Sequence, residues 1–145
     1  MVHENRHLIN CLRDYDYDTL LMRAVWSNDD DVFDYLIKKP QDFSVIARYG
    51  RNIIYYIVWF DRDDEKCESQ LIKLSQETNV ESLINKRNVH GNTPLHYAAP
   101  RNKHRTIARL ISMGSDVNLR DDDNELPDEY YSNDDETKRI IRQSR

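Results

Sequence analysis

Three runs of acidic residues are the first candidates for chemistry in this sequence, because grouped carboxylates bind divalent cations. They are DYDYD from Asp14, DRDDE at 61–65 and DDDNE at 121–125. A calcium loop alternates its oxygen ligands, turns at a glycine and ends on a bidentate glutamate. The first run alternates its aspartates, but Leu20 stands at or near the glycine turn and Val25 stands where the glutamate belongs. The other two runs fail in the same way, so the sequence predicts solvated acidic surface and no metal site.

The reactive side chains likewise lack the partners that catalysis needs. His96 lies in the stretch GNTPLHYAA at 91–99, and no further ligands are spaced to join it in the three or four contacts of a metal site. Cys11 and Cys67 stand far apart and outside any CxxC pair, which predicts free thiols in a reducing compartment. The chain has no glycine-rich phosphate loop, no G-x-S-x-G and no Cys–His signature. We therefore expect a protein that is not an enzyme, with no catalytic residue and no cofactor.

The composition sets limits on the partners. A chain of 145 residues is long enough for one domain with a sizeable core. Its net charge of −5 argues against nucleic acid as a partner. The longest apolar run, IIYYIVWF at 53–60, is far shorter than a membrane span, and MVHENRHLIN at the N-terminus lacks the pattern of a signal peptide. The expected location is cytoplasmic, with the nucleus as an additional one, and no membrane partner is expected.

The elements that position these side chains recur along the chain. Segments of one pattern start at residues 19, 52, 93 and 126, which gives steps of 33, 41 and 33. In the first and third segments, TLLMRAV and TPLHYAA, a threonine, a leucine and an alanine coincide. Pro94 and Pro127 are also 33 positions apart. Two equal steps and one step enlarged by eight residues indicate a repeat array.

Each unit begins with a short helix. Thr93 has the side chain of an N-cap, and Pro94 suits the first helical position because its missing N–H would be unpaired there anyway. Leu95, Ala98 and Ala99 follow with helical spacing and form one stripe of mostly small residues.

A second helix completes the unit. RTIARLISM at 105–113 places Ile107, Leu110 and Ile111 on one face. Asn102 tolerates the left-handed conformation of the reversal before this helix, and Gly114 ends it. The corresponding helices of the other units are expected in VFDYLIKK, in ESQLIKLSQ at 68–76 and in DETKRIIRQ.

GNTPLHYAA followed by ARLISMGSDVN resembles the ankyrin repeat, whose signature is T-P-L-H-x-A with a period of about 33 residues. The resemblance implies an all-α fold, an ankyrin-repeat solenoid of about four helix-turn-helix units with capping ends. It also implies that His96 forms hydrogen bonds within its own turn and to a neighbouring one. The single domain 1–145 divides into an N-terminal cap 1–13, repeats 14–46, 47–85 with the insertion and 86–118, and a C-terminal capping repeat 119–145.

The resemblance further implies where a partner binds, because the turn tips and the outer positions of the first helices line a concave face in ankyrin arrays. The residues carried over to that face are Trp26, Arg48, Tyr49, Arg51, Trp59, Phe60, Arg87, Val89, His90, Asn92 and Arg101. Trp26 and Trp59 are 33 positions apart and are expected to stack in register on it. The alternative is that both fill gaps under the enlarged second loop. Trp, Tyr and Arg are frequent hot spots of interfaces, so the sequence predicts a protein-binding surface.

Two functions fit such a surface. The first is a binding module that captures a protein by its concave face. Short ankyrin proteins of this kind are similar to the inhibitor-of-NF-κB-like proteins of viruses, a resemblance that implies a Rel-type transcription factor as partner. The second is an adaptor or scaffold that recruits an enzyme complex such as a ubiquitin ligase. The oligomeric state is left open.

Overall fold

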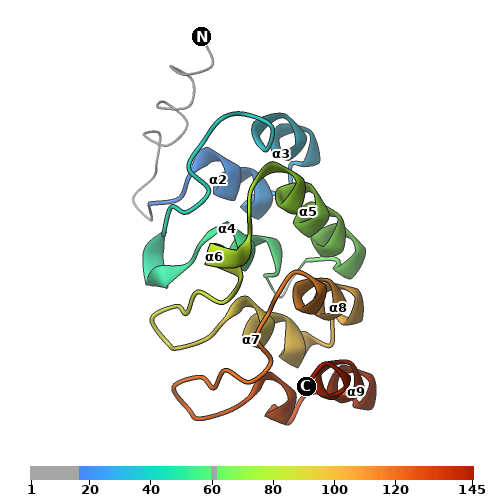
Figure 1. The fold of residues 1–145 in the computed structure, drawn as a ribbon. Coiled ribbons are helices and arrows are strands. Elements are labelled where there is room, and N and C mark those ends of the chain that lie inside the picture. Colours follow the sequence, from blue (N-terminus) through green and yellow to red (C-terminus); the bar gives the residue numbers. More distant parts are fainter. Residues whose placement is uncertain (1–16, 60–61) are drawn as a thin grey trace.

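The computed structural model describes residues 17–59 and 62–145 as a stack of paired helices (Figure 1). Within these two ranges there is no β-strand, as the all-α prediction requires. The expected N-terminal cap 1–13 and the site residue Phe60 lie outside the described residues.

The helices form two layers that alternate along the chain. The first layer holds α2 (Leu20–Trp26), α4 (Ile53–Ile57), α7 (Pro94–Ala98) and the short 3₁₀ helices η2 (Ala99–Arg101) and η3 (Pro127–Glu129). The second layer holds α3 (Asp30–Leu36), α5 (Asp64–Glu77), α8 (His104–Ser112) and α9 (Asp135–Gln143). Two short elements, η1 (Arg48–Gly50) and α6 (Glu81–Ile84), lie in the connections between units.

The first-layer helices begin where the periodicity places them. Their N-caps are Thr19, Asn52, Thr93 and Leu126. The Thr19 hydroxyl accepts from the N–H of Met22, and the Asn52 side chain accepts from the N–H of Ile54. These bonds satisfy N–H groups that have no partner inside a helix.

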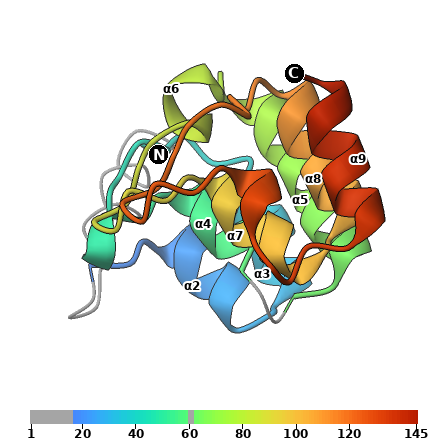
Figure 2. The same cartoon turned by 90° about the horizontal axis from the view of Figure 1, so that it is seen from below.

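The core runs through the whole stack because no unit can bury both faces of its own helices. Within the first layer α2 packs on α4 and α4 on α7, and within the second α5 packs on α8 and α8 on α9 (Figure 2). Small side chains such as Ala24 and Ala98 are buried between successive units, and Leu95 is 1% exposed. The connecting loops project on the side of the first layer that faces away from the second (Figure 2).

The enlarged second unit has its extra residues mainly in a longer helix. The sequence predicted a helix at 68–76, whereas α5 has 14 residues and α8 has 9. Asp63 caps the start of α5 by accepting from the N–H of Lys66, and Asp64 and Glu65 in its first turn complement the helix dipole. Cys67 is buried in this helix as a free thiol; Cys11 lies outside the described residues.

In the last unit, ion pairs stabilise a position at which the other units have apolar side chains. Asp128 occupies the position that corresponds to Leu95 and is 3% exposed. Its carboxylate accepts from Arg145 at 2.7 Å and from Arg142 at 3.0 Å. These bonds, the one from Arg145 first, hold the pKa of Asp128 at about 2.

Leu95→Ala should lower the free energy of unfolding by about 2–5 kcal/mol, because it leaves a cavity in the core of the third unit. Urea unfolding followed by circular dichroism measures this change. Leu20→Ala, a half-buried leucine in α2, serves as the control and should destabilise less. Equal losses in the two variants would contradict the placement of Leu95 in the core.

Asp128 predicts a loss of stability in acid. Its pKa in the folded chain lies below the ordinary 3.8, so the stabilisation is complete above about pH 4 and disappears as the pH falls to about 2. A shift of this size corresponds to about 2 kcal/mol. Urea midpoints at a series of acidic pH values should fall steeply for the natural chain and less for Asp128→Asn. Parallel curves would show that the two arginines do not stabilise the fold through this carboxylate.

Candidate protein-binding site

Three aromatic side chains from successive units contact one another on the first helix layer. Trp26 ends α2, Trp59 follows α4, and Tyr97 lies in α7. The ring centroids of Trp26 and Trp59 are 5.7 Å apart, and those of Trp59 and Tyr97 are 5.5 Å apart. The rings meet edge to face, with interplanar angles of 65° and 66°, a favourable arrangement of their quadrupoles. We call these three residues the aromatic ladder.

The ladder agrees in part with the expected arrangement of the tryptophans. Trp26 and Trp59 do lie side by side in adjacent units, but they meet edge to face and are not stacked. Trp26 is 55% exposed and Trp59 is half-buried, so Trp26 does not fill a gap in the core. In the third unit Pro100 takes the position that corresponds to the tryptophans, and the neighbouring Tyr97 supplies the ring.

A guanidinium group lies against the middle of the ladder. The central carbon of the Arg51 guanidinium is 5.3 Å from the centroid of Trp59, 5.2 Å from that of Tyr56 and 5.3 Å from that of Tyr49. Arg48 lies 5.0 Å from the Tyr49 ring as well. Among the predicted site residues, Arg48, Tyr49, Arg51, Trp59 and Trp26 are thus connected by contacts.

A small hollow of ≈ 240 Å³ adjoins the ladder. Its wall is formed by Trp59, His96, Tyr97, Pro100 and Arg101. Pockets that hold whole small molecules are larger, about 300–1,000 Å³, so this hollow is the size of a side chain. It connects Arg101 with the other predicted residues, and Tyr97 lies in the same wall.

The remaining predicted residues lie in or directly beside the turns between units, which we call fingers and define as residues 47–51, 88–92 and 121–125. Val89 and His90 are exposed at the middle finger. The Val89 N–H donates to the Tyr49 carbonyl at 3.0 Å, and the Asp122 N–H donates to the His90 carbonyl at 3.3 Å. Each finger is therefore tied to the next by a main-chain hydrogen bond.

Arg87 lies directly before the middle finger, Asn92 is its last residue, and both have structural contacts. Arg87 donates to the Arg120 carbonyl at 2.6 Å. The Asn92 carbonyl accepts from the Tyr55 hydroxyl at 2.5 Å, and its N–H donates to the Asn88 side chain. The main chain of Asn92 thus holds the finger in place, a role that the sequence analysis did not assign to it.

Two glycines allow the fingers to approach this closely. Gly50 and Gly91 have φ values of +76° and +74°, in the left-handed region that glycine adopts without strain. A Cβ on Gly50 would lie 3.1 Å from the Val89 nitrogen, and a Cβ on Gly91 would lie 2.9 Å from the Asp122 nitrogen. Side chains at these positions would push the fingers apart.

A buried lysine positions the central tryptophan. Lys103 is 6% exposed, and its ammonium donates to the carbonyl oxygen of Trp59 and lies 3.8 Å from the Cys67 sulfur. Burial lowers the pKa of Lys103. The lysine belongs to the third unit and Trp59 to the second, so this bond fixes the tryptophan across the boundary between repeats.

His96 has the hydrogen bonds that the ankyrin resemblance implies. Its Nδ1 accepts from the Thr93 N–H at 3.1 Å and lies 2.8 Å from the Thr93 hydroxyl. With Nδ1 accepting, Nε2 carries the proton and donates to the Glu125 carbonyl at 3.2 Å in the next finger. Burial lowers the pKa of His96 and keeps the ring neutral.

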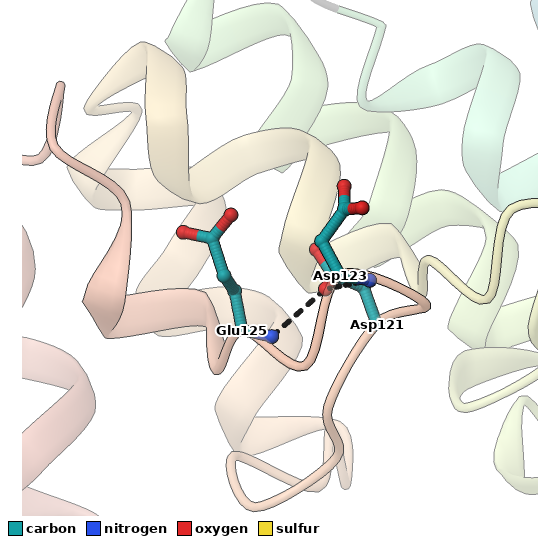
Figure 3. Close-up of side chains that lie close together, drawn as sticks. All are labelled: Asp121, Asp123 and Glu125. Atoms are coloured by element: carbon teal, nitrogen blue, oxygen red, sulfur yellow. Dashed lines mark hydrogen bonds between the residues drawn. The ribbon is translucent and has the colours of Figure 1, made fainter.

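The acidic run at 121–125 forms a cluster in the last finger. Oxygen atoms of Asp121, Asp123 and Glu125 lie within 4.8 Å of one another (Figure 3). The Asp121 carboxylate accepts from the N–H groups of Asp123 and Glu125, at 3.0 and 2.9 Å, and from the Tyr130 hydroxyl at 2.6 Å. The oxygens of Asp121 are therefore occupied by hydrogen bonds that hold the finger together, whereas a metal site would need them as ligands.

Asn88 makes the same bonds one repeat earlier. It accepts from the N–H groups of His90 and Asn92, and its amide donates to the Tyr97 hydroxyl. An uncharged amide can thus replace the carboxylate at this position of the finger, which explains Asp121 by the geometry of the repeat.

Paired helices in two layers, joined by stacked fingers, define a helical repeat solenoid. The family model of ankyrin repeats (3 copies) matches residues 21–121. The chain belongs to the ankyrin-repeat family, whose repeats form a protein-interaction module. Within the described residues, no helix has both the length and the apolar character needed to cross a membrane.

Two curated proteins are similar to this chain. The phosphocholine transferase AnkX of Legionella pneumophila is 26% identical over 106 residues, 73% of this chain and 11% of that protein. The nuclear factor NF-kappa-B p100 subunit of Xenopus laevis is 26% identical over 84 residues, 58% of this chain and 8% of that protein. The chain thus aligns with about a tenth of the length of these relatives.

Sequence reasoning missed two residues of the site, Tyr97 and Lys103. Tyr97 belongs to the helical stretch that was assigned to the core, although its position corresponds to Tyr56 in the unit before. Lys103 stands in a turn, where a lysine is normally solvated. No pattern in the sequence marks a lysine whose partner is a main-chain carbonyl 44 residues away.

The neutral His96 predicts that stability declines below about pH 6.5. There the unfolded chain binds a proton at the ordinary pKa of 6.5, while the buried ring resists it, so the stability is complete above this pH and is lost as the pH falls. The contribution is at most about 1.4 kcal/mol per pH unit. Urea midpoints between pH 8 and 5 should fall less in His96→Gln than in the natural chain. Identical slopes would contradict a neutral buried His96.

Proposed function

We propose that this chain is a non-catalytic binding module that captures a protein partner on its concave face, formed by the fingers and the first helix layer. The aromatic ladder with Arg51 against it is the observation that carries the proposal. Large aromatic and arginine side chains give much contact area for little loss of conformational freedom, which is why they recur as hot spots.

The arrangement of this surface supports its use as an interface. The ladder residues come from three units but are held by contacts to one another, and Lys103 and a finger hydrogen bond fix the second and third units against each other. A surface ordered before binding loses less entropy in the complex. Trp26, Tyr49 and Val89 nevertheless expose large apolar areas to solvent, a feature of binding surfaces when such residues are grouped.

A Rel-type transcription factor is the partner we put first, in the cytoplasm and also in the nucleus. Support comes from the similarity to an NF-kappa-B subunit over 84 residues and from the resemblance to short inhibitor-like ankyrin proteins of viruses. In this proposal the chain holds the factor through its concave face and so inhibits its signalling.

An adaptor role is the second candidate. The exposed fingers and the second helix layer lie on different sides of the stack (Figure 2), so one partner on the concave face leaves the α3, α5, α8 and α9 side accessible. A scaffold that recruits an enzyme complex such as a ubiquitin ligase needs two accessible surfaces of this kind.

Trp59→Ala should weaken partner binding by at least about 2 kcal/mol, because Trp59 contacts both other rings of the ladder and Arg51. Isothermal titration with a purified Rel-type protein measures the affinity, and urea unfolding of the same variant measures its stability. Trp59 is half-buried, so we expect a moderate loss of stability besides the loss of affinity.

Trp26→Ala is the matched control at the edge of the ladder. It removes an exposed ring and should weaken binding with little effect on unfolding. A folded Trp59→Ala chain with the affinity of the natural chain would remove the ladder from the site. Failure of Rel-type proteins to bind, together with capture of subunits of a ubiquitin ligase, would favour the adaptor.

A further inference from the structure

The environment of Arg51 differs from that of the ion-paired arginines of the second helix layer. Arg105 pairs with Glu65 and Glu68, and Arg139 pairs with Glu136. Within the described part of the chain Arg51 has no carboxylate partner. Its recorded contacts are the rings of Tyr49, Tyr56 and Trp59 and one hydrogen bond from its Nε to the Arg48 carbonyl.

This setting prepares the guanidinium group to bind an anion. Arginine interacts with aromatic rings through its positive charge and its delocalised π system, and this interaction does not use the N–H donors, which lie in the plane of the group. The Arg48 carbonyl accepts from the Nε donor, and within residues 17–59 and 62–145 no group accepts from the donors at the two terminal nitrogens. Two parallel donors fit the two oxygens of a carboxylate, and a bidentate pair of this kind is among the strong hydrogen bonds.

The apolar hollow is lined by the same tryptophan. Trp59 contacts Arg51 at 5.3 Å and also forms part of the wall of the hollow with Tyr97 and Pro100. An extended peptide rises about 3.3 Å per residue. An anion on Arg51 and a side chain in the hollow therefore belong to positions a few residues apart in one short segment.

We propose that the concave face binds a peptide segment in which an Asp or Glu stands about two to four residues from a large apolar side chain. The carboxylate pairs with Arg51, and the apolar side chain enters the hollow beside Trp59. This inference rests on the proposed function, because it assigns the chemistry of the partner to that same surface.

The distribution of charge favours an acidic peptide over the other ligands of such a surface. The chain carries a net charge of −5, yet the side chains around the ladder include Arg48, Arg51 and Arg101. Aromatic rings beside arginine also bind single-stranded nucleic acid, but the finger next to Val89 and His90 carries Asp122 and Asp123, both exposed. These carboxylates repel the continuous row of charges on a phosphate backbone more strongly than a peptide segment that carries a single carboxylate.

The test is selection from a phage-displayed library of random linear peptides on the immobilised full chain. We expect the enriched peptides to share an Asp or Glu a few residues from Trp, Phe, Leu or Met. A synthetic peptide with the enriched sequence is then titrated against the chain by fluorescence anisotropy, beside two altered peptides. In one the acidic residue is replaced by Lys, and in the other the apolar residue is replaced by Ser.

Two variants separate the two halves of the site. Arg51→Gln should lower the affinity for the selected peptide at least about tenfold and remove the difference between it and its Lys version. Trp59→Ala should weaken all three peptides. Arg139→Gln, on α9 and away from the ladder, is the matched control and should bind as the natural chain does.

Each contrary result has its own meaning. Enriched peptides that depend on Trp59 but show no acidic preference, or keep it in Arg51→Gln, would overturn the inference and leave the proposed function standing. No enrichment, or binding unaffected by Trp59→Ala in a folded chain, would contradict the proposed function and the inference with it. If a labelled oligothymidylate bound as tightly as the best peptide, the inference would be wrong and nucleic acid would be the ligand of this surface.

Discussion

The close approach of the main chain between successive fingers is the constraint on which the rest of this structure depends. Tyr49 and Val89 share a hydrogen bond of 3.0 Å, and His90 and Asp122 share one of 3.3 Å. Such contacts require Gly50 and Gly91, where a Cβ would meet neighbouring main chain or the Asp122 side chain. They set the spacing of the second, third and fourth units, and between the second and third units this spacing brings the rings of Trp59 and Tyr97 to 5.5 Å.

The same spacing explains why the enlarged second unit does not interrupt the surface. The additional residues extend α5 in the second layer, whereas the finger and the first helix of the next unit keep their usual lengths. The longer helix leaves intact the contacts of the second unit with its neighbours through α4 and through a finger hydrogen bond. The third unit carries Pro100 where the others carry tryptophan, and Tyr97 restores an aromatic contact with Trp59.

Local rules predicted the elements of this fold well. The N-caps at Thr19, Asn52 and Thr93 and the left-handed Asn102 follow from the preferences of single residues, and the family pattern implied the bonds of His96. The site was harder to predict, because it depends on contacts between units. Two of its contacts join residues more than thirty positions apart in the chain, namely Trp26 with Trp59 and Lys103 with Trp59. The contact of Arg51 with Trp59 depends on how the finger packs against the first helix layer. The position of Asn92 in the repeat predicted a surface residue, whereas its main-chain hydrogen bonds hold the finger in place.

Lys103 shows how stability and binding are connected in such an array. Placing an ammonium group at 6% exposure is unfavourable, and the pKa of Lys103 is lowered accordingly. The third unit thereby gains a donor that reaches the carbonyl of Trp59 in the second. An apolar side chain would fill the same volume but would leave that carbonyl without this donor. The lysine therefore contributes less to the core than to the position of Trp59, the ring that the aromatic ladder, Arg51 and the hollow share.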